Sequence, residues 1–321
     1  MLGRASHGWA DDASRLTLRQ ACMPLRPALN IAVVRETAMP KAKNGPVELY
    51  YETFGDPANE AVLLINGLGS QLTRWPEPFC ALLIQKGLFA IRFDNRDVGL
   101  STWLDGQSYT TDDMAADCAA VLDAVGKDKA HIVGVSMGGM IAQVFAANYP
   151  QRTLSLTSIM SSSGNPDLPP ATPEAWAVLI EPAADPADEE AFIAKGVRSA
   201  RVIGSPAYPW DEDLIRERVI SEARRAFNPA GVGRQMAAVR AGGDRRPKLA
   251  KVTAPTVVLH GADDPLVPLE AGRDTAANIA GAELVVIPGM GHDLPPNLYQ
   301  TFADTIWRAV QRSRATAPAT A

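Results

Sequence analysis

The stretch Gly134-Val135-Ser136-Met137-Gly138-Gly139 decides the fold of this chain. It lies between a short apolar run at 131–135 and a helical pattern at 137–148. Gly-x-Ser-x-Gly between a strand and a helix predicts a nucleophile elbow, a tight turn that exposes the serine hydroxyl above a sheet. The glycines permit so crowded a turn because they lack a Cβ. A glycine turn that serves only helix–strand packing is the alternative, and the strand–turn–helix context disfavours it.

Predicted strands and helices alternate on both sides of this turn. Short strands that alternate with helices are typical of βαβ units and of a mainly parallel sheet with helices on both faces. We therefore expect an α/β fold with a central sheet. The patterns predict strands at 47–53, 61–66, 88–93, 131–135, 154–160, 255–260 and 283–287, and helices at 76–86, 111–125, 137–148 and 296–312.

The alternation stops between residues 164 and 248, where the sequence is rich in proline and charge. Helical spacing continues there without strands, at about 173–181, 187–202, 211–227 and 230–240. We expect residues 164–248 to form a helical lid, inserted before the penultimate strand, over a core made of 44–163 and 249–314.

The two ends of the chain differ from the rest. Arginines are scattered through residues 1–43 without a clean apolar segment, which argues against a secretory signal. We expect this arm to be poorly ordered. The tail at 315–321 contains only alanine, threonine and proline, and we expect it to be disordered.

Composition excludes several classes of function. Apolar residues make up 46% of the 321-residue chain, and the formal charge of −5 gives no reason to expect nucleic acid or a membrane as a partner. No apolar run approaches the roughly 18 residues of a membrane-spanning helix. We expect a soluble, cytoplasmic protein, and a homodimer remains open.

Neither metals nor cofactors are expected. The three cysteines, Cys22, Cys80 and Cys118, are far apart and show no metal-ligand spacing. The turn Gly67-Leu68-Gly69 lacks the third glycine of a dinucleotide site, and 134–139 contains no lysine for a phosphate-binding loop.

A serine hydroxyl needs a base, and the chain has four histidines. His7 is in the arm, His131 opens the strand that leads to Ser136, and His260 ends a later strand. His292 lies in a loop after the last predicted strand, at the sheet edge where such folds assemble their sites. We therefore expect His292 to be the base.

The acid that orients the histidine follows the serine and precedes the histidine in this fold. Asp263 and Asp264 both follow the strand at 255–260, and sequence physics alone does not separate them. The oxyanion requires two backbone N–H groups. We expect one from Met137, beside the nucleophile, and the other from Leu68 in the earlier glycine turn.

The segment 94–101 carries several charges, and we interpret it as a structural turn whose side chains satisfy backbone groups. Aromatic residues near the predicted site are candidates for a substrate pocket, although core packing explains them equally well. They are Trp75 after the oxyanion turn and Trp176, Tyr208 and Trp210 in the lid.

From about residue 44 to 312 the chain resembles α/β-hydrolases of the aclacinomycin methylesterase type. The resemblance implies a serine esterase with Ser136 as nucleophile, His292 as base and Asp264, rather than Asp263, as acid. It also implies Leu68 and Met137 as the oxyanion hole. The matching stretches are 47–49, 54–57, Phe93-Asp94-Asn95-Arg96-Asp97-Val98-Gly99-Leu100-Ser101, 134–138, Asp264-Pro265 and Ile287-Pro288-Gly289-Met290-Gly291-His292.

These features predict a carboxylic ester hydrolase that forms an acyl-enzyme on a small to medium ester. The same triad would also serve an enol-lactonase, a carbon–carbon bond hydrolase or a perhydrolase. A ligand-binding receptor that retains a slow triad is the remaining alternative.

Overall fold

The computed structural model describes residues 39–316 except 183, 186 and 187. The chain divides into two units, Met1–Asn30 and Ile31–Ala321, and all described residues belong to the second. Most of the expected arm at 1–43 and nearly all of the expected tail at 315–321 lie outside the described residues.

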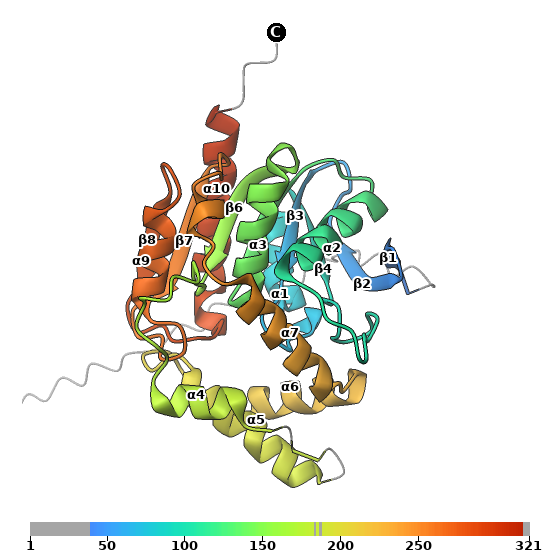
Figure 1. Cartoon of the computed structure of the whole chain (residues 1–321), viewed down its shortest axis with the longest axis vertical. Coiled ribbons are helices and arrows are strands. Elements are labelled where there is room, and N and C mark those ends of the chain that lie inside the picture. Colours follow the sequence, from blue (N-terminus) through green and yellow to red (C-terminus); the bar gives the residue numbers. More distant parts are fainter. Residues whose placement is uncertain (1–38, 183, 186–187, 317–321) are drawn as a thin grey trace, which may run out of the picture. The chain divides into compact units, whose positions relative to one another are not determined.

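A mostly parallel sheet forms the centre of the described part of the chain (Figure 1). Its eight strands have the order β1-β2-β4-β3-β5-β6-β7-β8. The pairs β1–β2 and β2–β4 are antiparallel, and every other pair is parallel. The strands are β1 (Lys41–Asn44), β2 (Val47–Phe54), β3 (Glu60–Ile65), β4 (Leu88–Phe93), β5 (Ala130–Val135), β6 (Thr153–Ile159), β7 (Thr256–Gly261) and β8 (Glu283–Ile287).

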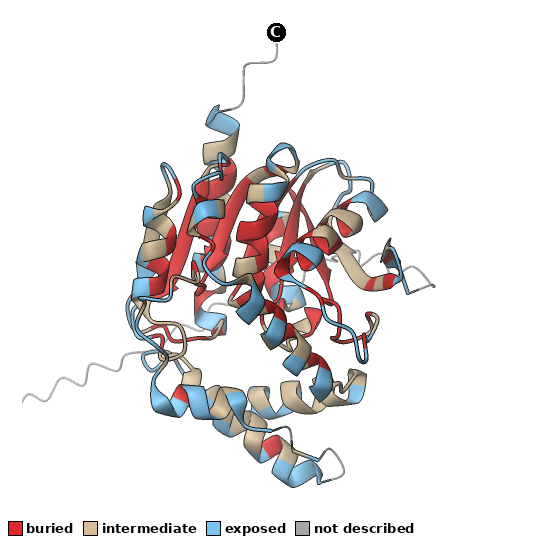
Figure 2. Cartoon of the chain, in the orientation of Figure 1, coloured by how far each residue is buried: buried red, intermediate tan, exposed pale blue. Residues whose placement is uncertain are grey.

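Helices cover both faces of the sheet because the central strands are apolar on both faces. In β3, Leu63 and Ile65 join one buried cluster, and Val62 and Leu64 join the other. The first cluster includes residues of α2 (Thr111–Ala124) and α3 (Met137–Asn148), and the second includes residues of α1 (Glu77–Gln85) and α10 (Tyr299–Thr316). Figure 2 shows the central strands and α3 mostly buried. The α/β architecture expected from the sequence is confirmed.

Four of the five described helices between β6 and β7 lie wholly within residues 164–248, and we call this segment the insertion. They are α4 (Pro173–Ile180), α5 (Glu189–Ile203), α6 (Glu212–Arg225) and α7 (Pro229–Gly242). Each begins after a side chain that caps its first turn, from Thr172, Asp188, Asp211 and Asn228. Figure 2 shows α4, α5 and α6 mostly half-buried or exposed.

One strand and two short α-helices of the described residues were not predicted. The strand β1 begins at Lys41, inside the segment that we expected to be a poorly ordered arm. Its sequence Lys-Ala-Lys-Asn contains one apolar residue, too few to show a period of two. The short helices α8 (Arg246–Leu249) and α9 (Leu269–Ala277) also lack a long apolar period.

The segment 94–101 joins the core to the insertion. Asp94 accepts hydrogen bonds from the amides of Leu72 (2.7 Å) and Leu100 (2.9 Å) and pairs with Arg225 of α6 at 2.8 Å. Asp97 accepts from the Leu104 amide at 2.7 Å, and Arg234 of α7 donates to both of its oxygens. These bonds agree with the structural turn inferred from the sequence.

A buried ion pair fixes the same segment to α2. Arg96 donates to Asp117 from Nε (2.6 Å) and from Nη2 (2.7 Å), and Asn44 donates to Asp117 at 2.8 Å. Burial raises the pKa of the Asp117 carboxyl, and the Arg96 guanidinium opposes that rise. Both side chains are almost fully buried, so the guanidinium has no access to bulk water if its partner is lost.

The variant Asp117→Ala should therefore lose about 3–5 kcal/mol of the free energy of unfolding, because it leaves a buried guanidinium unpaired. Urea denaturation measures the change. The control Lys43→Ala removes an exposed pair with Glu48 at 3.7 Å and should change stability by less than about 1 kcal/mol. Equal losses in the two variants would contradict this account.

Candidate active site

The backbone at Ser136 has a conformation that non-glycine residues rarely adopt. Its φ is 53° and its ψ is −122°, at the junction of β5 and α3. The Ser136 amide donates to the Ile159 carbonyl at 3.0 Å, which ties the turn to β6. Strained backbone of this kind persists where the surrounding packing determines it, and it is frequent at functional sites.

Glycines allow this turn to pack against its neighbours. A Cβ at Gly134 would collide with the Gly138 carbonyl, and a Cβ at Gly138 would collide with the backbone oxygens of Ile65 and Asn66. The start of α3 therefore lies directly against the end of β3, with no side chain between them.

The structure brings together the three side chains that we expected to form a triad. The Ser136 hydroxyl donates to Nε2 of His292 at 3.0 Å, and Nδ1 of His292 donates to Oδ2 of Asp264 at 2.8 Å. His292 is 8% exposed and Asp264 is 6% exposed. The three residues follow β5, β7 and β8, whose parallel directions place their carboxyl ends at one edge of the sheet.

The two neighbouring aspartates have different surroundings. Oδ1 of Asp264 accepts from the amides of Leu266 (2.9 Å) and Val267 (2.8 Å), which leaves Oδ2 for the histidine. Asp263 is exposed, and its Oδ2 accepts from the Gly289 amide at 2.8 Å. Only Asp264 touches His292.

The other two described histidines have structural partners. His131 lies at the start of β5 and shares a 2.9 Å hydrogen bond with the Ser155 hydroxyl. Burial lowers the pKa of His131 to about 4. Burial also lowers the pKa of His260, which is buried and whose Nε2 donates to the Val267 carbonyl at 2.7 Å. Burial therefore favours the neutral form of both rings.

A cavity of about 480 Å³ opens at the Ser136 hydroxyl. Apart from Ser136, the side chains that line it are uncharged and apolar, and they come from the core and the insertion together. Trp176, a predicted pocket residue, is among them, together with Leu68 and Met137, which were predicted for the oxyanion hole. The lining also includes residues that were not predicted: Met140, Pro170, Ala171, Pro173, Leu179, Met236, Val239, Leu266 and Val267.

The backbone of Leu68 and Met137 is arranged around the serine. Met137 is the first residue of α3, where an N–H has no acceptor within the helix. Gly67, before Leu68, is so near that a Cβ placed on it would lie 3.2 Å from the Ser136 Cβ. The Gly69 amide after Leu68 donates to the Gln235 side chain at 2.8 Å, which fixes this turn to α7.

The structure places three other predicted pocket residues away from the cavity lining. Trp75 is fully buried in the core and stacks on Phe79, with 5.2 Å between ring centroids. The Tyr208 hydroxyl donates to the Pro288 carbonyl at 3.2 Å. The Trp210 ring packs against the Arg201 guanidinium, 5.2 Å from the ring centroid. The aromatic type of a residue does not show whether its side chain faces the core or a cavity. Met236 and Val239 are three residues apart and therefore lie on one face of α7, and this spacing could have identified them as pocket residues.

A second cavity of about 560 Å³ adjoins the first, and Leu179 and Met236 line both. Its lining is more polar and includes Arg74, Lys195 and Glu222. Arg74 pairs with Glu222 of α6 at 2.5 Å.

Within the described residues, no group of three or more histidine, cysteine, aspartate or glutamate side chains could hold a metal ion. None of the described helices is long and apolar enough to cross a membrane.

The fold and the elbow define a class of protein. The sequence model of the family described as the alpha/beta hydrolase fold matches residues 60–296. The chain therefore belongs to this family and is a hydrolase.

Comparison with individual proteins shows which hydrolases this chain is similar to. The chain is 31% identical over 284 residues to rhodomycin D methylesterase DnrP of Streptomyces peucetius, covering 82% of this chain and 95% of that protein. It is 26% identical over 241 residues to 3-oxoadipate enol-lactonase 2 of Acinetobacter baylyi, covering 75% and 85%. A meta-cleavage product hydrolase structure from Pseudomonas fluorescens superposes with a TM-score of 0.69 at 18% identity, covering 85% and 97%. The expected resemblance to the methylesterase type is confirmed.

The packing at Gly138 yields a prediction. Gly138→Ala should lower the free energy of unfolding by about 1–3 kcal/mol, because the added methyl group meets fixed backbone oxygens rather than a mobile side chain. Gly233→Ala is the matched control within α7. A Cβ there has no neighbour within 4 Å, so the variant should gain about 0.5–1 kcal/mol. Thermal or urea unfolding measures both, and an unchanged Gly138→Ala protein would refute the close approach.

Proposed function

We propose that this hydrolase cleaves carboxylic esters with Ser136 as nucleophile, His292 as general base and acid, and Asp264 as the residue that orients His292. The supporting observation is the pair of hydrogen bonds that His292 makes, one to each partner. This arrangement gives the imidazole one acceptor nitrogen for the serine proton and fixes its tautomer through the other.

In the proposed reaction, His292 accepts the hydroxyl proton as Ser136 Oγ attacks the ester carbonyl. The tetrahedral intermediate collapses when His292 gives this proton to the leaving alcohol, and an acyl-enzyme remains. His292 then takes a proton from water as the water oxygen attacks the acyl carbon, and it returns this proton to Ser136 Oγ as the bond between Oγ and the acyl carbon breaks and the acid leaves. Asp264 stabilises the imidazolium ion in both halves of the reaction.

The amides of Leu68 and Met137 are the proposed donors to the oxyanion. Both residues line the cavity beside Ser136. Loss of one such donor costs about 10²–10³ in turnover. Since the backbone does this work, changes to either side chain should matter much less than changes to Ser136.

We further propose a neutral, apolar ester of small to medium size as substrate. The cavity at Ser136 is lined by methionine, proline, leucine, valine and tryptophan side chains, with no charged group to receive an ionised substrate. The similarity to the methylesterase named above supports an acyclic ester. The similarity to an enol-lactonase makes a lactone the second candidate. Turnover of matched acyclic and cyclic esters separates these two substrates.

Ser136→Ala and His292→Ala should each reduce kcat for p-nitrophenyl butyrate by a factor on the order of 10⁶, because the residues of a triad act as a unit. Release of p-nitrophenol measures the rate, and circular dichroism checks that each variant is folded. Near-full turnover by a folded Ser136→Ala protein would reject the proposal.

The two aspartates give a matched pair of variants. Asp264→Asn should reduce kcat by about 10⁴, because the amide no longer holds the histidine in the required tautomer. Asp263→Asn keeps an oxygen to accept from the Gly289 amide and does not touch His292, so kcat should stay within about tenfold of the wild-type value. A larger loss at Asp263 than at Asp264 would reverse the assignment.

A further inference from the structure

The loop that carries His292 is held by the insertion as well as by the core. Residues 203–208, at the end of α5 and in the following connection to α6, run beside residues 289–293. The His292 amide donates to the Ile203 carbonyl at 2.7 Å, and the Ala207 amide donates to the Gly289 carbonyl at 3.2 Å. The backbone of the proposed base is therefore bonded directly to the insertion.

Ser205 lies at the centre of this contact. Its hydroxyl accepts from the Gly291 amide at 2.9 Å and donates to Oδ1 of Asp293. The hydroxyl thus bridges the residues immediately before and after His292. With the bond from the His292 amide to Ile203, three consecutive residues of the loop are attached to one turn of the insertion.

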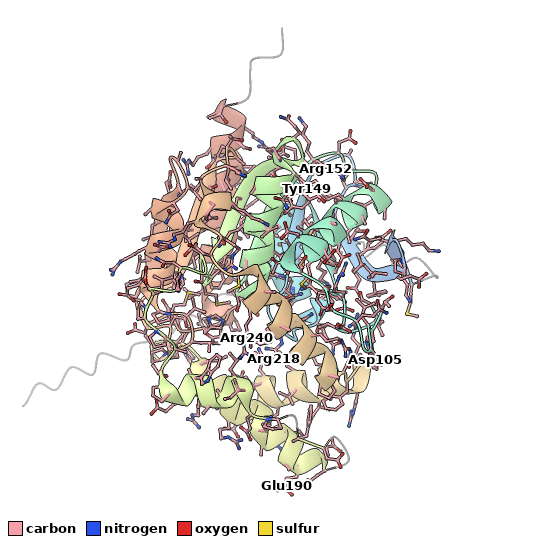
Figure 3. The ribbon with its side chains drawn as sticks, in the orientation of Figure 1. Asp105, Tyr149, Arg152, Glu190, Arg218 and Arg240 are labelled. Atoms are coloured by element: carbon pink, nitrogen blue, oxygen red, sulfur yellow. The ribbon has the colours of Figure 1, made fainter. Side chains whose placement is uncertain are left out.

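The bridge lies in a half-buried, charged environment. Burial raises the pKa of the Asp293 carboxyl, and the bond from Ser205 and the charges of Arg218 and His292 oppose that rise. Arg218 belongs to α6, and burial lowers its pKa to about 10. Figure 3 labels Arg218 where the insertion helices meet the core.

Glycines permit the close approach here too. A Cβ on Gly291 would collide with the Gly204 carbonyl, and a Cβ on Gly289 would collide with the Ala207 side chain. At Gly291 the contact is backbone against backbone, so a small shift of the turn at 203–205 would displace the loop.

The core holds the other end of the same loop. The Gly289 amide donates to Asp263 at 2.8 Å, and the Asp263 amide donates to the Met290 carbonyl at 3.0 Å. Met290 is the last residue of the loop that is bonded to Asp263 in this way. Residues 291 and 292 make their backbone bonds to the insertion instead.

We propose that Ser205 is a positioning residue for the triad, which holds the His292 imidazole between Ser136 and Asp264 by bridging the Gly291 amide and the Asp293 carboxyl. This inference rests on the proposed function, in which His292 is the base. The insertion then has two roles, because it lines the cavity at Ser136 and its residue Ser205 also aligns His292.

The test compares Ser205→Ala, Ser205→Thr and the control Ser221→Ala. Threonine keeps the hydroxyl, and Ser221 is an exposed serine on α6. One readout is the rate constant for labelling of Ser136 by a fluorophosphonate, which requires an aligned base but no turnover. The other is kcat and KM for p-nitrophenyl butyrate. Thermal unfolding is measured for each variant.

Ser205→Ala should label about 10–100-fold more slowly and lose kcat by the same factor, since a misplacement of about 1 Å can cost 10² in rate. KM should stay within about twofold, because Ser205 does not line the cavity at Ser136. Ser205→Thr should recover most of both rates, and Ser221→Ala should match the wild type.

Wild-type labelling by Ser205→Ala would overturn the inference. Equal losses in the alanine and threonine variants would also overturn it, because the hydroxyl would then have no separate role. A wild-type protein that is labelled but does not turn over esters would reject the proposed function alone, and the labelling rates would still decide the role of Ser205.

Discussion

The close packing of backbone around Ser136 is the constraint on which the site depends. A positive φ at a residue with a side chain costs about 1–3 kcal/mol, and it persists only where neighbouring structure enforces it. Here the enforcement comes from α3, which begins against the end of β3 where Gly138 lacks a Cβ, and from β6, whose Ile159 carbonyl binds the Ser136 amide. The Ser136 hydroxyl is therefore held at one fixed position at the end of β5.

The other parts of the site meet this point from separate loops. Asp264 is fixed by two amides of its own turn, so one carboxylate oxygen remains for His292. The loop of His292 is fixed by Asp263 at one end and by the insertion at the other. The insertion is in turn attached to the core by the pairs of Arg225 with Asp94 and Arg234 with Asp97. The same hydrogen bonds and ion pairs between insertion and core therefore hold both His292 and the walls of the cavity at Ser136.

The fold and the positions of Ser136 and His292 could be predicted because they depend on local patterns. Apolar runs of four to eight residues predicted the strands, and the rule that loops gather at one sheet edge placed Ser136 and His292 together. Sequence physics left Asp263 and Asp264 equal. Their difference arises from hydrogen bonds to amides in different loops, which no pattern records.

The contacts of the insertion could not be predicted for the same reason. Ser205 reaches Asp293 across 88 residues, and Arg234 reaches Asp97 across 137. Trp75, Tyr208 and Trp210 were candidates for a pocket because they are aromatic and follow the oxyanion turn or lie in the lid, with core packing as the alternative, and their burial, hydrogen bonding and ring packing place them elsewhere. Such pairings depend on three-dimensional packing, which periodicity does not encode.

The central claim is that catalysis proceeds through an acyl group on Ser136. Rapid acid quenching during turnover of p-nitrophenyl butyrate, followed by mass spectrometry of proteolytic peptides, tests it most directly. The account predicts a butyryl group on the peptide that contains Ser136, formed at a rate no slower than kcat. An acyl group on another residue, or turnover with no acylated peptide together with unimpaired hydrolysis by Ser136→Ala, would contradict it.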